Sequence, residues 1–319
     1  MARKVILDVD PGVDDALALS FALFHPGLDV VAVTAVGGNC SPANATRNLQ
    51  AIIEALDPPR LPRLGAASEP EPEVGLPAEG RGIYGPDGLG GTNLPVAERQ
   101  HLPPAEKVIC DQVRASPDAI TIVALGPLTN IARAFQRDPE LPSLVGRVVM
   151  AGGAVAISGN YTAAAEFNMF CDPPAAQAVF RSASTKTLIP LDVTNRVTLS
   201  FDLYNQLPDE ATRVGKLLRQ ILPSAFRGYR QRFGIEGIHV HDTVALMAVL
   251  YPELFTAHEM AGDVETVGEL TTGMTVFDRR RIPARQYNME VAMDLQKDAV
   301  IERIIQGLNQ AAGREANEG

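Results

Sequence analysis

The sequence contains little cysteine and no cysteine pair. Its three cysteines, Cys40, Cys110 and Cys171, are widely separated and form neither a C-x-x-C motif nor a Cys/His set of the kind that binds zinc. A disulfide framework and a structural zinc site are therefore not predicted. We expect reduced, mostly buried thiols in a cytoplasmic protein.

Long apolar runs and an excess of positive charge are also missing. No uninterrupted apolar stretch approaches the ~20 residues that span a bilayer, and the N-terminus, MARKVILDVD, enters a strand pattern without a signal peptide. The formal net charge of -10 argues against nucleic acid or an anionic membrane as the main partner. We therefore expect no nucleic acid and no membrane among the partners of this chain.

Apolar, β-branched runs alternate with helix-compatible stretches along most of the chain. Short buried strands are predicted at Val5–Val9, Val30–Val36, Ile120–Leu125, Val145–Met150 and Thr187–Leu191. Helices are predicted between them, at Asp14–Phe24, Ala43–Leu56, Ala105–Ala115, Leu128–Phe135 and Pro173–Arg181. This alternation predicts an α/β, Rossmann-like fold: a single domain, residues 1–319, with a mostly parallel central sheet flanked by helices.

Two regions depart from the alternation. Residues 57–95 are rich in Pro, Gly and Glu, and we expect a long loop that is mobile over an active site. The C-terminal part is predicted to add extra helices and strands: residues 199–251 as helices broken at Pro208 and Pro223, strands at Val264–Val267, Met274–Phe277 and Asn288–Met293, and a last helix from about Gln296. The polar tail, residues 310–319, is expected to fray.

Four carboxylates lie within eight residues, directly after the first predicted strand. They are Asp8, Asp10, Asp14 and Asp15 of DVDPGVDD. Carboxylates this close repel one another and lose hydration in a cleft, so a hard cation such as calcium or magnesium is expected to neutralise them. Attraction to a helix N-terminus, ~0.3–1 kcal/mol each, accounts for one or two of the acids but not for the whole cluster. Asp8 lies deepest and is expected to be a structural hydrogen-bond acceptor.

Further polar side chains follow other predicted strands, at the strand ends where open α/β sheets bind ligands. Asn39 follows two glycines, and Asn160, Glu166 and Asn168 follow a second Gly-Gly turn. Amide and carboxylate groups near an aromatic side chain suit a polyhydroxylated ligand such as a sugar. A simple turn or a polar loop remains the alternative for each of them.

A His-Asp pair precedes an apolar helix, Val244–Leu250, in the C-terminal third. His241 is a candidate for the site, with an ordinary half-buried histidine as the alternative. Asp242 is a candidate as well, with capping of that helix as the alternative.

The chain resembles the inosine–uridine-preferring nucleoside hydrolase family over nearly its whole length. The motifs that carry the resemblance occur in order: DVDPGVDD, GGN, the DGLGG loop, LGPLTNIA, the GGA–GN–AEFN stretch and HD. The first motif is highly specific, whereas GGN is weak by itself. The resemblance implies a calcium-dependent enzyme that hydrolyses ribonucleosides to free base and ribose, a role in nucleoside salvage, and a homodimer or homotetramer.

The resemblance also implies roles for the residues at matching positions. The general base would be Asp10, and the histidine that assists the leaving base would be His241. Calcium would be held by Asp10, Asp15, Asp242 and the backbone carbonyl of Leu125. The ribose would be held by Asp14, Asn39, Asn160, Glu166 and Asn168. The base pocket is expected to contain Tyr84, Phe167 and Tyr229.

Tyr84 departs from the family pattern. Tyr84-Gly85 stands before the DGLGG loop, where pyrimidine-handling members usually have His-Gly. A tyrosine can hydrogen-bond a base, but it is a poor acid at neutral pH. The sequence therefore leaves purine and pyrimidine bases both open.

Two other functions fit parts of the pattern. A magnesium-dependent phosphohydrolase can also place Asp-x-Asp after its first strand, but it normally needs downstream Lys and Asp/Asn partners for the phosphate. A non-catalytic nucleoside- or sugar-binding protein has no need for Asp10, an extra base beside the metal. Calcium-dependent ribonucleoside hydrolysis is therefore our leading hypothesis.

Overall fold

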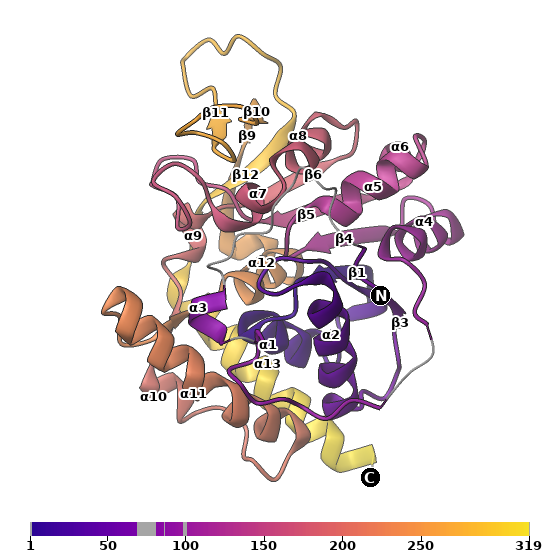
Figure 1. Cartoon of the computed structure of the whole chain (residues 1–319), viewed down its shortest axis with the longest axis vertical. Coiled ribbons are helices and arrows are strands. Elements are labelled where there is room, and N and C mark those ends of the chain that lie inside the picture. The colour runs from indigo at the N-terminus through magenta and orange to yellow at the C-terminus, as the bar shows by residue number, and fades with distance from the viewer. Residues whose placement is uncertain (1, 69–80, 86, 98–100, 319) are drawn as a thin grey trace.

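An eight-stranded sheet forms the centre of the molecule (Figure 1). In this computed structural model, which describes residues 2–68, 81–85, 87–97 and 101–318, the strand order is β3-β2-β1-β4-β5-β6-β12-β9. All neighbouring strands are parallel except β9, which pairs antiparallel with β12. The strands are β1 Arg3–Val9, β2 Leu28–Ala35, β3 Arg63–Gly65, β4 Ile120–Ala124, β5 Arg147–Ala151, β6 Lys186–Ile189, β9 Phe255–Met260 and β12 Met289–Leu295. The predicted α/β fold with a mostly parallel sheet is confirmed.

Helices cover both faces of this sheet because its strands bury side chains on both sides. In β1, for example, Leu7 and Val9 belong to one apolar cluster and Ile6 to the other. The first face packs against α1 Val13–Ala22, α2 Pro42–Leu56, α11 Arg213–Phe233, α12 His241–Leu250 and α13 Lys297–Glu318. The second face packs against α4 Ala105–Ala115, α5 Thr129–Arg137, α6 Leu141–Leu144 and α8 Pro173–Arg181. The five strands and five helices predicted before residue 192 all lie within two residues of their predicted bounds.

Short elements complete the fold at the ends of the main strands. The short helices are α3 Arg81–Tyr84, α7 Phe167–Cys171, α9 Leu191–Thr194, α10 Phe201–Tyr204 and a 3-10 turn at Pro252–Leu254. Two small antiparallel sheets pair β7 Thr198–Leu199 with β8 Ile238–His239, and β10 Gly262–Val264 with β11 Thr275–Phe277.

The prediction of a loop throughout residues 57–95 was wrong in two places. Arg63–Gly65 forms β3, which pairs with β2 at the edge of the sheet, and Leu64 is buried there. The short helix α3 packs closely against α11 at Gly228. A side chain at that position would prevent the contact, since its Cβ would lie 2.6 Å from the carbonyl oxygen of Ile83. Part of the predicted loop, residues 69–80 and 86, lies outside the described residues, and its expected mobility stays a prediction.

The C-terminal part required several corrections. The strand predicted at Val264–Val267 lies earlier, as β10 Gly262–Val264, and the region 199–251 predicted as helices contains the strand β8 Ile238–His239. Pro223 lies inside α11 and does not end it, because the buried side chains of Leu222 and Phe226 on either side hold the helix to the core and offset the ~3 kcal/mol of an internal proline. The edge strand β9 was not predicted. The last helix, α13, continues to Glu318, and Ala311 and Ala312 are buried against the body. The expected fraying of the tail stays a prediction.

The remaining composition-based expectations concern cysteines and membranes. The three cysteines are free and buried, as predicted. Among the described residues, no helix is both long enough and apolar enough to cross a membrane. Cytoplasmic localisation stays a prediction.

Candidate functional site

A cavity of about 400 Å³ lies at the carboxyl ends of the parallel strands β1, β2, β4, β5 and β6. This volume is within the range of ~300–1,000 Å³ that small-molecule sites occupy. Most of the predicted site residues line it: Asp10, Asp14, Asn39, Tyr84, Leu125, Asn160, Glu166, Phe167, Asn168, Tyr229, His241 and Asp242. Asp15 does not line the cavity and is fully buried behind it. The tertiary structure thus brings the predicted set together, although its members are spread over more than two hundred residues.

Asp10 is held at the floor of the cavity by the β2–α2 connection. The backbone N–H of Asn39 donates to Asp10 Oδ2 at 2.7 Å, and Asn39 Nδ2 donates to the Asp10 carbonyl at 3.2 Å. Two glycines pack against the same carboxylate, because a Cβ at Gly38 would overlap Asp10 Oδ2 and one at Gly126 would lie 2.8 Å from Oδ1. This close backbone approach leaves the carboxylate little freedom to move.

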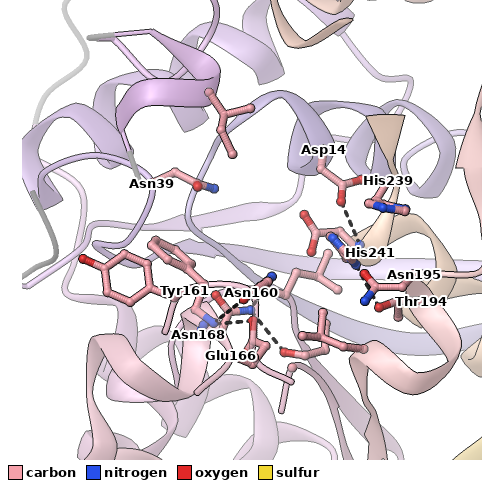
Figure 2. Close-up of a pocket in the computed structure, with 18 of the residues that line it drawn as sticks. Asp14, Asn39, Asn160, Tyr161, Glu166, Asn168, Thr194, Asn195, His239 and His241 are labelled. Carbon is pink, nitrogen blue, oxygen red and sulfur yellow. Dashed lines mark hydrogen bonds between the residues drawn. The ribbon is translucent and has the colours of Figure 1, made fainter. Parts of the chain in front are cut away.

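Asp14 joins the N-terminal ends of α1 and α12. Its Oδ2 accepts a hydrogen bond from the backbone N–H of Asp242 at 3.1 Å, as Figure 2 shows between Asp14 and the start of α12. The side chain of Asp242 does not cap α12, whose N-cap position is Val240. The capping role considered for Asp242 is therefore filled from α1, and the Asp242 carboxylate is left to line the cavity.

Asp15 and Asp8 are buried beneath the cavity. Asp15 Oδ2 accepts from the backbone N–H of Gly12 at 3.0 Å, which ties the carboxylate to the first turn of α1. Asp8 Oδ1 accepts from the hydroxyl of Thr34 and, at 2.8 Å, from Asn130 Nδ2. Asp8 is thus the structural acceptor that was predicted.

Burial raises the pKa of every carboxyl in this cluster. It is the largest cause for Asp14, whose pKa rises to about 8, and for Asp15, whose pKa rises to about 6. The pKa values of Asp10 and Asp242 lie well above the ordinary value, first through burial and then through repulsion by neighbouring carboxylates, including Asp15. Backbone N–H groups lower the pKa values of Asp10, Asp14 and Asp15 but do not offset burial, so keeping these carboxyls ionised is unfavourable without a cation.

The donor chemistry of the cluster fits a hard cation. Oδ1 of Asp14 and Oδ1 of Asp15 are buried and have no hydrogen-bond partner, and a cation would relieve such orphaned oxygens. All of the candidate donors are oxygen atoms, which calcium prefers. Within the described residues, however, no three His, Cys, Asp or Glu side chains are arranged around a common metal position. Charge and donor type support a calcium site here, while the present side-chain arrangement does not form a closed ligand set.

Hydrogen bonds to the backbone determine which way the side-chain amides of Asn160 and Asn168 are oriented. Asn168 Nδ2 donates to the carbonyls of Leu125 at 2.8 Å and Ala151 at 3.1 Å, so the Asn168 side-chain oxygen remains as an acceptor. Asn160 Oδ1 accepts from the backbone N–H of Phe167 at 2.9 Å, so its NH₂ group remains as a donor. This assignment follows because a carbonyl partner requires the amide nitrogen and an N–H partner requires the amide oxygen.

Glu166 links the two loops that carry these amides. It is the N-cap of α7 and accepts from the backbone N–H groups of Asn168 at 3.0 Å and Met169 at 3.1 Å. It also accepts from the backbone N–H of Gly153 at 2.9 Å. Burial raises its pKa, and the backbone bonds lower it. Figure 2 shows Asn160, Glu166 and Asn168 gathered on one side of the cavity, opposite the two histidines.

His241 is buried beside a hydroxyl and a second histidine. Its Nδ1 lies 2.8 Å from Thr194 Oγ1, and its ring centroid is 5.4 Å from that of His239. Burial, followed by repulsion from His239, lowers the pKa of His241 to about 3. Burial therefore favours the neutral imidazole at physiological pH, in which one ring nitrogen can donate a hydrogen bond and the other can accept one.

Aromatic side chains line the cavity on both sides. The Tyr84 and Tyr229 hydroxyls are hydrogen-bonded to each other, and burial raises the pKa of both. The Tyr229 ring lies edge-on to His239, with centroids 5.9 Å apart. Across the cavity, Phe167 packs edge-on against Tyr161 at 5.7 Å. Tyr84, Phe167 and Tyr229 are thus positioned where an aromatic base can be held.

The sequence analysis missed the contribution of α9. Thr194 contacts His241, and both oxygens of Asp192 accept at 2.8 Å from the backbone N–H groups of Val155 and Ala156, in the loop that leads to Asn160. Thr194 and Leu191 also line the cavity. These residues directly follow β6. The tendency of open α/β sheets to bind ligands at the carboxyl ends of their strands, which identified Asn39, would therefore have indicated them as well.

Comparisons with known proteins agree with this geometry. The model of the family described as "Inosine-uridine preferring nucleoside hydrolase" matches residues 5–302. The non-specific ribonucleoside hydrolase RihC of Escherichia coli O6:H1 is 38% identical over 296 residues, which cover 92% of this chain and 94% of that protein. The pyrimidine-specific ribonucleoside hydrolase RihA of Shewanella sp. (strain ANA-3) is 34% identical over 310 residues, which cover 97% of this chain and 96% of that protein.

A solved structure is similar over the whole fold. The purine-preferring ribonucleoside hydrolase from Gardnerella vaginalis superimposes with a TM-score of 0.90 at 30% identity, covering 97% of this chain and 99% of that one. These matches confirm the resemblance carried by the motifs and the predicted enzyme class, nucleoside hydrolase.

Proposed function

We propose that this chain, which belongs to the inosine-uridine preferring nucleoside hydrolase family, hydrolyses the N-glycosidic bond of ribonucleosides and releases the free base and ribose. The observation that carries the proposal is the meeting, in one cavity, of a buried carboxylate cluster with an amide- and carboxylate-lined side and an aromatic side. The similar proteins are named for ribonucleoside hydrolysis, with non-specific, pyrimidine-specific and purine-preferring members among them.

The charge of the cavity favours an uncharged sugar over a phosphate ester. Its lining includes the carboxylates of Asp10, Asp14, Glu166 and Asp242, and among the described lining residues Arg232 is the one lysine or arginine. A phosphate group would therefore lack most of the lysine and arginine partners that usually hold it. The phosphohydrolase alternative is therefore disfavoured.

The amides and acids supply complementary partners for ribose hydroxyls. The Asn168 oxygen is left to accept and the Asn160 NH₂ group to donate, while Asp14 keeps Oδ1 without a protein partner. A hydroxyl can both donate and accept, so these groups can orient the sugar. Holding the ribose in one geometry near the attacking water lowers the entropic part of the barrier. A 2′-deoxyribonucleoside lacks the 2′-hydroxyl and would therefore lose part of these hydrogen bonds.

Asp10 is the group best placed to take a proton from the attacking water. Its carboxylate lies on the cavity floor, fixed by the Asn39 backbone and by Gly38 and Gly126. The negative charge around it stabilises the positive charge that develops on the ribosyl group as the glycosidic bond breaks.

Calcium would be held by Asp10, Asp15, Asp242 and the carbonyl of Leu125. When bound, it would lower the pKa of a water molecule and favour ionised carboxylates. The Leu125 carbonyl already accepts from Asn168 but has a second lone pair for such a role.

On the leaving-group side, His241 is the proposed hydrogen-bond donor to the departing base. Tyr84 and Tyr229 are proposed to contact the base as neutral groups, because their raised pKa values exclude proton donation as a strong acid.

A substrate panel tests the proposal. Purified protein should release free base and ribose from inosine, adenosine, uridine or cytidine, and should be much slower with the matching 2′-deoxynucleosides. Phosphate release from a phosphomonoester, without base release from any ribonucleoside, would replace this function with that of a phosphohydrolase. Ligand binding without any turnover would identify a binding protein.

A further inference from the structure

His239 lies in the wall of the cavity but has no role in the function proposed above. It belongs to β8, where it pairs with Thr198 of β7, and its side chain is half-buried. Asn195, at the C-terminal end of α9, lines the same cavity. Figure 2 shows His239, His241 and Asn195 on one side of the cavity, across from Asn160. The two residues without a role therefore lie on the side where the leaving base is expected.

The imidazole of His239 turns one of its nitrogens toward the backbone. Nδ1 lies 3.5 Å from the carbonyl oxygen of Val197 and 3.5 Å from Thr198 Oγ1. A carbonyl can only accept, so this contact favours the proton on Nδ1 and leaves Nε2 as an acceptor. Within the part of the chain that the structure describes, Nε2 has no hydrogen-bond partner. Burial lowers the pKa of His239, which favours this neutral form.

Two neighbouring rings hold the His239 imidazole in place. The Tyr229 ring stands nearly edge-on to it, with centroids 5.9 Å apart and an interplanar angle of 69°. The His241 ring lies on another side, with centroids 5.4 Å apart. A side chain that is already packed loses little conformational freedom when a ligand binds. His239 thus offers a fixed acceptor next to His241.

Asn195 adds an amide whose donor and acceptor are both available. Its backbone N–H donates to the carbonyl of Leu191 at 3.1 Å, which fixes the position of the residue at the end of α9. Its side-chain amide makes no hydrogen bond to any residue in the described ranges. Because the amide can turn, it can pair either with a carbonyl or with an unprotonated ring nitrogen of a ligand.

We propose that His239 is a specificity-determining residue that accepts a hydrogen bond from an N–H group on the polar edge of the base, while Asn195 binds the neighbouring atom of that edge. The inference rests on the proposed function, in which the ribose lies at Asn160 and the base extends toward His241. Hypoxanthine, guanine and uracil carry a ring N–H beside a carbonyl, and adenine and cytosine carry an amino group beside a ring nitrogen.

This pair of residues accounts for both classes of base with one arrangement. An acceptor that needs only an N–H, beside an amide that can turn, takes oxo and amino bases alike. A base without an N–H on this edge leaves Nε2 of His239 unpaired in a desolvated site, and a site built to hydrogen-bond its ligand discriminates against such an analogue. The substrate class is therefore ribonucleosides whose base carries an N–H on its polar edge.

Steady-state kinetics with inosine and purine riboside tests the inference, because unsubstituted purine has no N–H on this edge. The variants are His239→Phe, which keeps a packed ring, His239→Gln, which keeps an acceptor near the position of Nε2, and Asn195→Leu. The matched control is His258→Phe, since His258 is exposed on β9 and does not line the cavity. Each variant is compared with the wild type on the same substrate, so the different reactivities of the two leaving groups cancel. Thermal unfolding checks that each variant is folded.

His239→Phe is expected to lower kcat/KM for inosine by about 3- to 10-fold, the effect of one hydrogen bond, and to change that for purine riboside by less than about twofold. His239→Gln should recover most of the inosine rate. Asn195→Leu should lower kcat/KM for both substrates, because both present a ring atom to the amide, and His258→Phe should lower neither. Equal losses on the two substrates in His239→Phe would overturn the proposal and leave His239 as a support for His241.

Binding separates this inference from the proposed activity. A wild-type chain that turns over no ribonucleoside would contradict the proposed function, and calorimetric titration with the two ribosides would still test His239. Tighter binding of inosine that His239→Phe abolishes would support the inference. Equal affinity of the wild type for both ribosides, or no binding of either, would overturn it.

Discussion

Thr194 Oγ1 lies 2.8 Å from Nδ1 of His241 and occupies that side of the imidazole. The other ring nitrogen, Nε2, is therefore the one left for a ligand in the cavity. Thr194 stands on α9, and Asp192 of the same turn holds the loop that leads to Asn160. One helical turn thus supports both His241 and the loop that carries Asn160, a proposed ribose partner.

Thr194→Val should slow the hydrolysis of inosine by about 3- to 10-fold, because one hydrogen bond of ~0.5–1.5 kcal/mol that orients His241 is lost. Hydrolysis of p-nitrophenyl riboside should fall less, since its leaving group needs no proton. Thr194→Ser, which keeps the hydroxyl, should restore the inosine rate. Steady-state kinetics with both substrates provides the measurement, and an equal loss on both would show that Thr194 supports the fold rather than His241.

Asp10→Asn should lower kcat by roughly 10²–10⁴-fold, the usual contribution of a general base. Much of the affinity for the ribonucleoside should remain, because the ribose partners Asn160 and Asn168 are unchanged. Kinetics and calorimetric titration of the variant measure the two quantities separately. Turnover at the wild-type rate would remove Asp10 from the role of base.

Gly38→Ala should impair activity through Asp10. The new Cβ would overlap Asp10 Oδ2, and displacing that carboxylate costs ~1–3 kcal/mol in a packed site. The control is Gly313→Ala in α13, where the Cβ meets open space and the helix gains ~0.5–1 kcal/mol. Urea unfolding and kcat are measured for both variants. An active Gly38→Ala enzyme would show that the carboxylate has more freedom than its contacts indicate.

Exhaustive chelation should abolish activity, and calcium should restore it. Calcium should also raise the melting temperature, since a ligand at 100 times its Kd stabilises the folded state by ~2.7 kcal/mol. Asp15→Asn should remove most of that shift, because it neutralises the buried carboxylate whose Oδ1 has no partner. Full activity in a demonstrably metal-free sample would contradict the calcium assignment.

Lys186 should give the protein a pH-dependent stability that its methionine variant lacks. Its Nζ is buried and donates to the carbonyls of Ser182 at 2.6 Å and Ser184 at 2.8 Å. Burial lowers its pKa from 10.5 to about 8. Between those two pH values the unfolded chain binds more protons than the folded one, so the wild type gains stability relative to Lys186→Met as pH rises.

The comparison requires urea unfolding of the wild type and Lys186→Met at pH 7.5 and at about pH 10, near the pKa of an unfolded lysine. Other titrating groups are common to both proteins and cancel in the difference. A stability difference that is the same at both pH values would show that the Lys186 pKa is not lowered by folding.

The sequence alone determined the alternating elements and most of the site's composition. Hydrophobic periodicity is a local property, so the early strands and helices could be predicted to within two residues. Asp10 and Asn39 each follow a strand of a parallel sheet, and such strand ends meet at one edge. The position of these two residues at strand ends was therefore enough to predict that they share one site.

Only the tertiary structure decided how these groups are paired. The bond from the Asp242 backbone to Asp14 spans more than two hundred residues, and no local pattern records which acid caps α12. Pro223 stays helical, because burial of the neighbouring side chains Leu222 and Phe226 outweighs local propensity. The contact between Thr194 and His241 likewise depends on α9 packing against α12. Long-range packing sets these contacts, since the free energy of burial depends on which surfaces meet and not on the residues of one segment.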